Sequence, residues 1–154
     1  MVFVSVLKSR RLPSKADYVN TANQIYVDTM QFLTRLSSRY ARLMAGEPAK
    51  LAAELIEHTE KANKIFPSDE QRKDIRRAHL LEAQATLSAL DVSLLHCYLM
   101  MIQNPQGCFT TASGKTVSPS EAEERLDRIS QNIGELIDQE ETLLRGILNS
   151  DKKR

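Results

Sequence analysis

The stretch from Ser68 to Asn104 constrains the fold most, because it carries the signals of one long helix. Ser68 and Gln71 have the spacing of a capping box, in which two side chains satisfy free backbone amides at a helix start. Asn104 precedes Pro105, and a residue before proline is pushed out of the helical region, so the helix ends there. At about 1.5 Å per residue, a helix between these signals spans roughly 50 Å.

Two rows of apolar side chains run along this predicted helix, each at alternating steps of three and four residues. The first row consists of Ala78, Leu81, Ala85, Ser88, Val92, Leu95, Leu99 and Ile102. The second row consists of Leu80, Ala83, Leu87, Leu90, Leu94, Cys97 and Met101. The rows occupy heptad positions that face in roughly opposite directions, and a helix that is apolar on two faces needs cover on both. We therefore expect this helix at the centre of an α-bundle, with one face against another copy of the chain.

We assign the second row to the contact between copies. The interface residues of this hypothesis are Leu80, Leu87, Leu90, Leu94 and Met101. The sequence leaves the opposite assignment open, and a charged residue at Leu87 or Leu94 separates the two. Such a change dissociates the copies if the row is an interface, and it unfolds the protein if the row is core.

Two helices are predicted before this one. Ser14 caps the first, whose apolar row continues to Leu43, with Gly46 as the residue that ends it. Pro48 suits the first turn of the second helix, and Pro67 ends it. The link to the following helix is so short that the two helices must be antiparallel neighbours.

A loop and a last helix follow. Residues 105–118 are expected to form a small hairpin-like loop with Gly114 in its turn. Ser118 and Glu121 form a capping box with a proline between them, which is a strong start for a helix. Glu140 interrupts the apolar row of that helix, and we expect it to reach solvent or to pair with a neighbouring chain.

These elements predict an all-α protein, an antiparallel up-and-down four-helix bundle with a small hairpin-like loop between helices 3 and 4. Only 5% of the residues are aromatic and there are five glycines, which agrees with an all-α fold. Residues 1–13 are expected to form an extended basic arm, residues 14–149 the bundle domain, and residues 150–154 a frayed basic tail.

Catalytic and metal-binding patterns are missing from the sequence. Three scattered histidines and two cysteines have no metal-ligand spacing, so we expect no metal, no cofactor and no enzyme activity. The cysteines, one in a helix and one in a loop, do not suggest a disulfide framework, which indicates a reducing, cytoplasmic setting. No apolar run approaches the ~20 residues of a membrane span.

Charge is unevenly distributed along the chain, although the net charge is only +1. Residues 1–45 carry seven basic and two acidic side chains, a net of +5, whereas residues 119–149 carry three basic and eight acidic, a net of −5. Such asymmetry suggests an anionic partner at one end or head-to-tail association of copies. For any single charge, a solvated helix face is the simpler explanation.

Three groups of basic side chains are candidates for contact with nucleic acid. One lies before the first helix, one forms a line at i, i+4 and i+7 on that helix, and one lies at the start of the long helix, where the dipole favours anions. These residues are Lys8, Arg10, Arg11, Arg35, Arg39, Arg42, Arg72, Lys73, Arg76 and Arg77.

The opening SVLKSRR, the helix pattern, the loop NPQGCFTTASGKTV and the closing helix together resemble a family of small bacterial and phage four-helix-bundle proteins. That family includes the accessory variability proteins of diversity-generating retroelements, and bundle proteins encoded in ribosomal RNA intervening sequences. The resemblance covers essentially the whole chain in architecture.

The resemblance implies a non-enzymatic homopentamer that binds a reverse transcriptase and its template RNA, or DNA or an RNA–DNA hybrid, and supports mutagenic cDNA synthesis. It also implies that the basic residues named above form the binding surface. The alternative is a structural or protein-interaction bundle with no nucleic-acid role. Salt-dependent binding to RNA separates these two, and a saturable pocket would mark a third class, a bundle that binds a small molecule.

Overall fold

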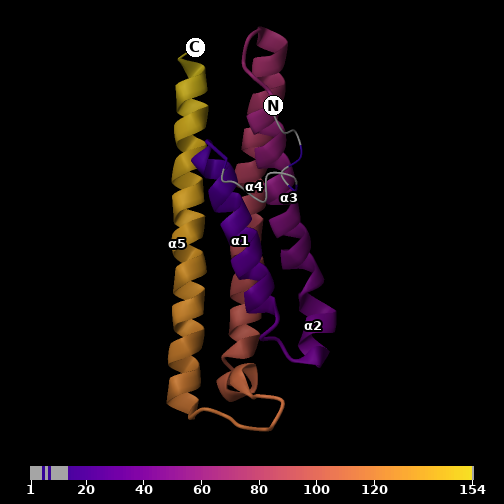
Figure 1. Ribbon diagram of the computed structural model, residues 1–154, viewed down its shortest axis with the longest axis vertical. Helices are drawn as coiled ribbons and strands as arrows, with labels where there is room; N and C mark the ends of the chain where they lie inside the picture. Colours follow the sequence, from indigo (N-terminus) through magenta and orange to yellow (C-terminus); the bar gives the residue numbers. More distant parts are fainter. Residues whose placement is uncertain (1–4, 6, 8–13, 154) are drawn as a thin grey trace.

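The computed structural model describes residues 5, 7 and 14–153. Helices are the only regular secondary structure among these residues, which confirms the all-α prediction, and no described helix has the length and apolar character of a membrane span. The elements are α1 (Asp17–Leu33), α2 (Ser38–Met44), α3 (Gly46–Lys64), α4 (Glu70–Met101), the 3-10 helix η1 (Pro105–Phe109) and α5 (Pro119–Lys152). Figure 1 shows α1, α3, α4 and α5 lying along the long axis of a narrow molecule.

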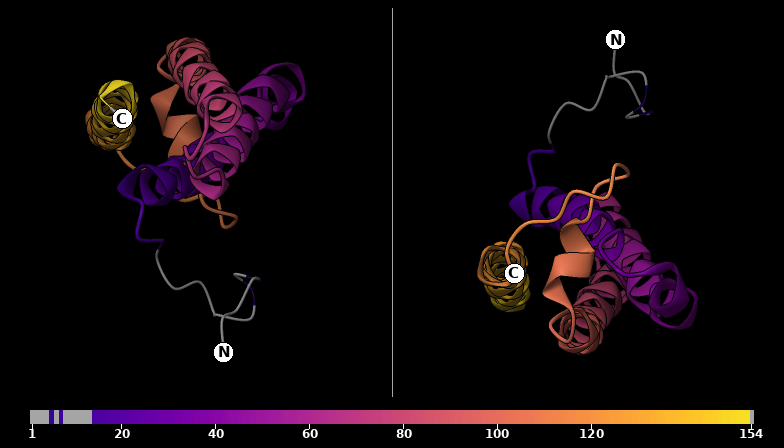
Figure 2. Two further views of the ribbon diagram at one scale, coloured as in Figure 1. Left: turned by 90° about the horizontal axis from the view of Figure 1, so that it is seen from above. Right: turned by 90° about the horizontal axis from the view of Figure 1, so that it is seen from below.

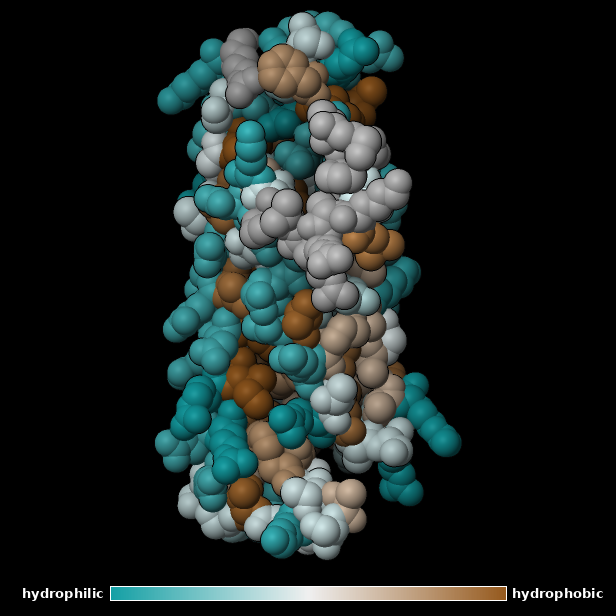
Figure 3. Space-filling model, in the orientation of Figure 1, coloured by the Kyte–Doolittle hydropathy of each residue, from teal (hydrophilic) through white to brown (hydrophobic). Residues whose placement is uncertain are grey.

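One hydrophobic core runs between the four long helices. Each helix places an apolar side chain in it with no exposed surface, namely Ile25, Leu55, Leu90 and Leu126. Burial of such a side chain contributes roughly 2 kcal/mol, so the core provides most of the stability. The outer surfaces are mixed: on the face drawn in Figure 3, apolar side chains appear between polar ones along the whole length.

Two contacts fix the relative direction of α4 and α5. Arg76 near the start of α4 pairs with Asp151 near the end of α5, and Tyr98 near the end of α4 donates a hydrogen bond to Asp127 near the start of α5. The two helices therefore run in opposite directions, as the colours of Figure 1 also show.

The first predicted helix is broken in the structure. α1 ends at Leu33, and the amides of Arg35 and Leu36 then bond three residues back, to the carbonyls of Phe32 and Leu33. Ser37 caps α2 by accepting a hydrogen bond from the Tyr40 amide. The predicted basic line over residues 35, 39 and 42 therefore does not exist as one helix face, because the break turns the chain between them.

The long helices also differ from the prediction at their ends. Asp69, one residue after the predicted Ser68, caps α4, and its carboxylate accepts from the Arg72 amide over 2.8 Å. Ser118 caps α5 as predicted. The end of α5 is later than expected, because the helix continues to Lys152 and Asp151 is held by an ion pair.

The predicted hairpin is present only as its turn. Gly114 has the left-handed φ of 83°, and the Thr111 amide donates to the Lys115 carbonyl over 2.9 Å. No strand precedes or follows this turn in the described loop. Instead Cys108 and Phe109 end η1 as buried side chains, and their burial keeps that segment from pairing as a strand.

Candidate interaction surfaces

The first apolar row of α4 lies on the surface. Leu81, Val92, Leu95 and Leu99 are 45%, 52%, 51% and 46% exposed. Their spacing is that of the a and d positions of a coiled coil, the pattern with which one helix packs along another. In a single chain this outer α4 face has no covering helix, and a continuous exposed apolar surface of this kind marks an interaction site.

The second apolar row forms the core of α4. Leu80 and Leu90 have no exposed surface, and Leu87, Leu94 and Met101 are 1%, 7% and 3% exposed. Their assignment to a contact between copies is therefore wrong, because side chains that are enclosed within one chain cannot reach a second one. The two faces were exchanged: the row assigned to the interface packs inside, and the other row is free for contact.

A groove lies between α4 and α5 and continues from the outer α4 face. Its volume is about 360 Å³. Leu95 belongs to both surfaces, since it lines the groove and is half exposed. Apolar side chains from three helices line it, namely Phe32, Leu94, Leu95, Ile133 and Ile137. The sequence does not predict this groove, because the groove depends on the distance between α4 and α5.

Acidic side chains surround the groove. Asp91 of α4 and Asp127 of α5 line it, and Glu123 and Glu124 lie beside Asp127 in the adjoining surface depression. Tyr98 donates a hydrogen bond to Asp127 across the two helices, and this bond raises the pKa of the Tyr98 hydroxyl to about 12. The groove is thus apolar inside and negatively charged at its edge.

The structure separates the predicted basic residues. Arg39 and Arg42 lie on α2, in the lower part of Figure 1, whereas Arg72 and Arg77 lie near the start of α4, in the upper part. In the described part of the chain, these basic residues therefore do not form one continuous surface. Lys8, Arg10 and Arg11 lie outside the described residues.

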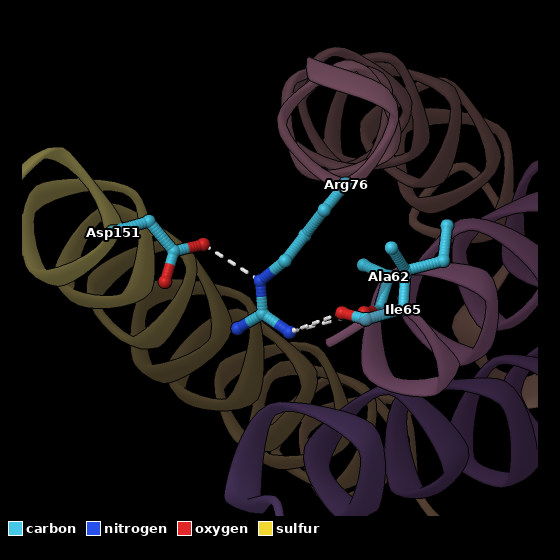
Figure 4. A network of polar contacts seen from close by, with 4 residues as sticks. All are labelled: Ala62, Ile65, Arg76 and Asp151. Carbon is cyan, nitrogen blue, oxygen red and sulfur yellow. Dashed lines mark hydrogen bonds and ion pairs between the residues drawn. The ribbon is translucent and has the colours of Figure 1, made fainter. Parts of the chain in front are cut away.

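Arg76 has a structural role instead. Its Nε donates to Asp151 over 2.6 Å, and one of its terminal nitrogens donates to the carbonyls of Ala62 and Ile65 over 3.1 and 3.2 Å (Figure 4). Its side chain is only 11% exposed. Arg76 therefore connects the ends of α3 and α5 through α4, and it is not available to a phosphate.

Three other predicted basic residues also have partners within the chain. Arg35 lies over the ring of Phe109 at 4.8 Å, and Arg72 pairs with the cap residue Asp69. Lys73 pairs with Glu70 over 3.4 Å. Of the predicted basic residues in the described part of the chain, Arg39, Arg42 and Arg77 are exposed and have neither an ion pair nor a ring contact.

Glu140 is a buried acid that neither predicted alternative describes. It has no exposed surface, and both of its carboxylate oxygens lack a hydrogen-bond partner among the described residues. Burial raises the pKa of its carboxyl to about 8, so the group is protonated at neutral pH. Its place in an apolar row of α5 was the signal that it faces the core.

A pair of histidines lies between α3 and α4. The Nδ1 atoms of His58 and His79 are 3.2 Å apart, and burial is the main cause that lowers the pKa of His79. No group of three or more metal-ligating side chains occurs among the residues that the structure describes. This pair connects two helices by one hydrogen bond.

Comparison of the chain with protein-family models, with curated proteins and with solved structures finds no match. The function proposed below is supported by the surfaces described here and by the resemblance in the sequence.

Proposed function

We propose that this chain is a non-enzymatic accessory protein of a diversity-generating retroelement. In this proposal it is an antiparallel four-helix bundle that assembles into a homopentamer and binds a reverse transcriptase and its template RNA. The resemblance in the sequence supports the partners and the number of copies. The exposed surfaces of the bundle support the self-association.

The observation that carries the proposal is the outer α4 face. An exposed row of leucine and valine at coiled-coil spacing is costly in water, since each such side chain gains roughly 1.5–3 kcal/mol when it is buried. A second copy is the simplest cover, because it brings helices of the same length and shape. A bundle with this surface acts by binding other chains.

Nucleic-acid contact in this proposal belongs to the end of the molecule where α4 begins. Arg77 is exposed there, in the second turn of α4. Lys8, Arg10 and Arg11 form the other basic group in the sequence. In a ring these groups repeat, and linked weak contacts can raise avidity by roughly 10² or more.

We expect that changing Lys8, Arg10, Arg11 and Arg77 together to glutamine weakens RNA binding at least tenfold. The reason is that contacts to phosphates release counterions, so the affinity of the unaltered protein also falls steeply with salt. Fluorescence anisotropy with a labelled RNA, titrated at several salt concentrations, measures both effects.

The control removes the same number of charges from basic residues that are already paired within their helices. It changes Lys50, Lys61, Arg128 and Arg145 to glutamine. Equal RNA affinity for both variants, with a flat response to salt, would contradict the nucleic-acid role.

The second candidate is a protein-interaction bundle with no nucleic-acid role. The net charge of +1 and the separation of the basic residues favour it. In that case RNA does not bind and self-association through the outer α4 face persists, so the same titration distinguishes the two candidates.

A further inference from the structure

We propose that copies of this chain associate head to tail, with α2 of one copy seated in the groove between α4 and α5 of the next. This inference rests on the proposed self-association and names the contact that produces it. The two surfaces are complementary in charge and each has an apolar part, and they lie on different sides of the molecule.

The exposure and charge of α2 suit a helix that inserts into a groove on another copy. None of its residues is buried, and Leu43 is 79% exposed. Arg39 and Arg42 are exposed beside it and have no ion pair within the described part of the chain. α2 therefore presents one exposed apolar side chain beside two positive charges that have no ion pair in the described part of the chain.

The groove offers the matching surface. Its apolar lining can take Leu43, while Asp91 at its edge and Glu123 in the adjoining depression can pair with the two arginines. No atom lies within 4 Å of the position where a side chain on Gly134 would begin, so the groove is open to an incoming helix at that point. Pairs between opposite charges at the edge of an apolar contact fix its register.

The positions of the two surfaces require a second copy. α2 and α5 lie at opposite edges of the view in Figure 1, and they are also apart when the molecule is seen from below in Figure 2. α2 of one chain therefore cannot enter its own groove. A surface that fits a different surface on the next copy gives a heterologous contact, which closes into a ring if the rotation between copies allows it.

The same contact accounts for two further features of the chain. The outer α4 face continues into the groove through Leu95, so a neighbour seated in the groove also covers part of that face. The net charges of +5 for residues 1–45 and −5 for residues 119–149 also favour an arrangement in which copies associate head to tail.

Charge reversal tests this contact. We expect R39E/R42E to sediment at the mass of one chain, 17.4 kDa, where the unaltered protein forms an assembly. D91K/E123K, which reverses the groove edge, should also be monomeric. Association returns when all four changes are in one chain, because each reversed surface then meets its complement.

K64E/K152E is the control, because it reverses two exposed charges at the other end of the molecule and should leave the assembly mass unchanged. L43E provides a second disruption that does not depend on charge pairing, and circular dichroism confirms that each variant is folded. An assembly of unchanged mass in R39E/R42E and L43E would overturn the contact while leaving self-association intact. If R39E/R42E instead loses only RNA binding, α2 is a nucleic-acid surface and the contact is wrong. An unaltered protein that is monomeric would also contradict the assembly in the proposed function.

Discussion

Replacing Leu87 with aspartate is expected to unfold the protein, whereas the same change at Val92 leaves it folded. Leu87 is 1% exposed in the core, and Val92 is 52% exposed on the outer α4 face. The core change removes roughly 2–3 kcal/mol of apolar burial and encloses a carboxylate, which costs several kcal/mol more. Together these losses approach the whole stability of a typical domain, about 5–15 kcal/mol.

Circular dichroism and urea titration of the two variants measure this difference. The Val92 variant should retain helicity and a cooperative transition, and it should associate less than the unaltered protein. A Leu87 variant that stays fully helical and only dissociates would restore the assignment of the second row to the interface, and it would contradict the packing described here.

Replacing Glu140 with glutamine is expected to stabilise the protein at alkaline pH. The buried carboxyl has a pKa of about 8 against its usual value of 4.5, so between these values the folded state holds a proton that the unfolded chain has released. The free energy of unfolding therefore falls as pH rises from about 4.5 to about 8. At about 1.4 kcal/mol per pKa unit, the loss is on the order of 3–5 kcal/mol.

Glutamine keeps the shape of glutamate and cannot ionise, so the Glu140 variant should lose this part of the pH dependence. Urea titrations between pH 5 and pH 9 measure it, with E135Q as the control at an exposed position of α5. The free energies of unfolding of E140Q and E135Q should differ little at pH 5 and most above pH 8. A free energy of unfolding that does not change with pH in the unaltered protein would show that Glu140 is not enclosed.

The sequence predicted the helical class well, because caps and prolines are local signals. Ser118 with its following proline determined the start of α5, and Pro67 the end of α3. The break after Leu33 was missed, since the apolar row continues through it. It depends on Ser37, whose capping role competes with an uninterrupted helix.

The two rows on α4 show where sequence periodicity stops being informative. Both rows have the same spacing, so spacing alone does not tell which one faces the core. Residue size does contain that signal: the buried row has leucine at positions where the exposed row has Ala78, Ala85 and Ser88. Large side chains fill a core, and small ones are tolerated at the surface.

The roles of single polar residues depended on contacts that are distant in the sequence. Arg76 and Asp151 are 75 residues apart, and no local pattern connects them. Arg76 therefore looked like part of a basic patch, although its contacts hold the ends of three helices together. Its neighbour Arg77 is exposed, and contact of Arg77 with nucleic acid remains a prediction.

The mass of the protein in solution tests self-association through the outer α4 face most directly. Sedimentation equilibrium across micromolar concentrations should give a multiple of 17.4 kDa, with five copies expected. Glutamate at both Leu81 and Val92 should reduce that mass towards one chain while helicity remains. A single-chain mass for the unaltered protein at every concentration would contradict the assembly, and an unchanged mass in the double variant would contradict the face assigned to it.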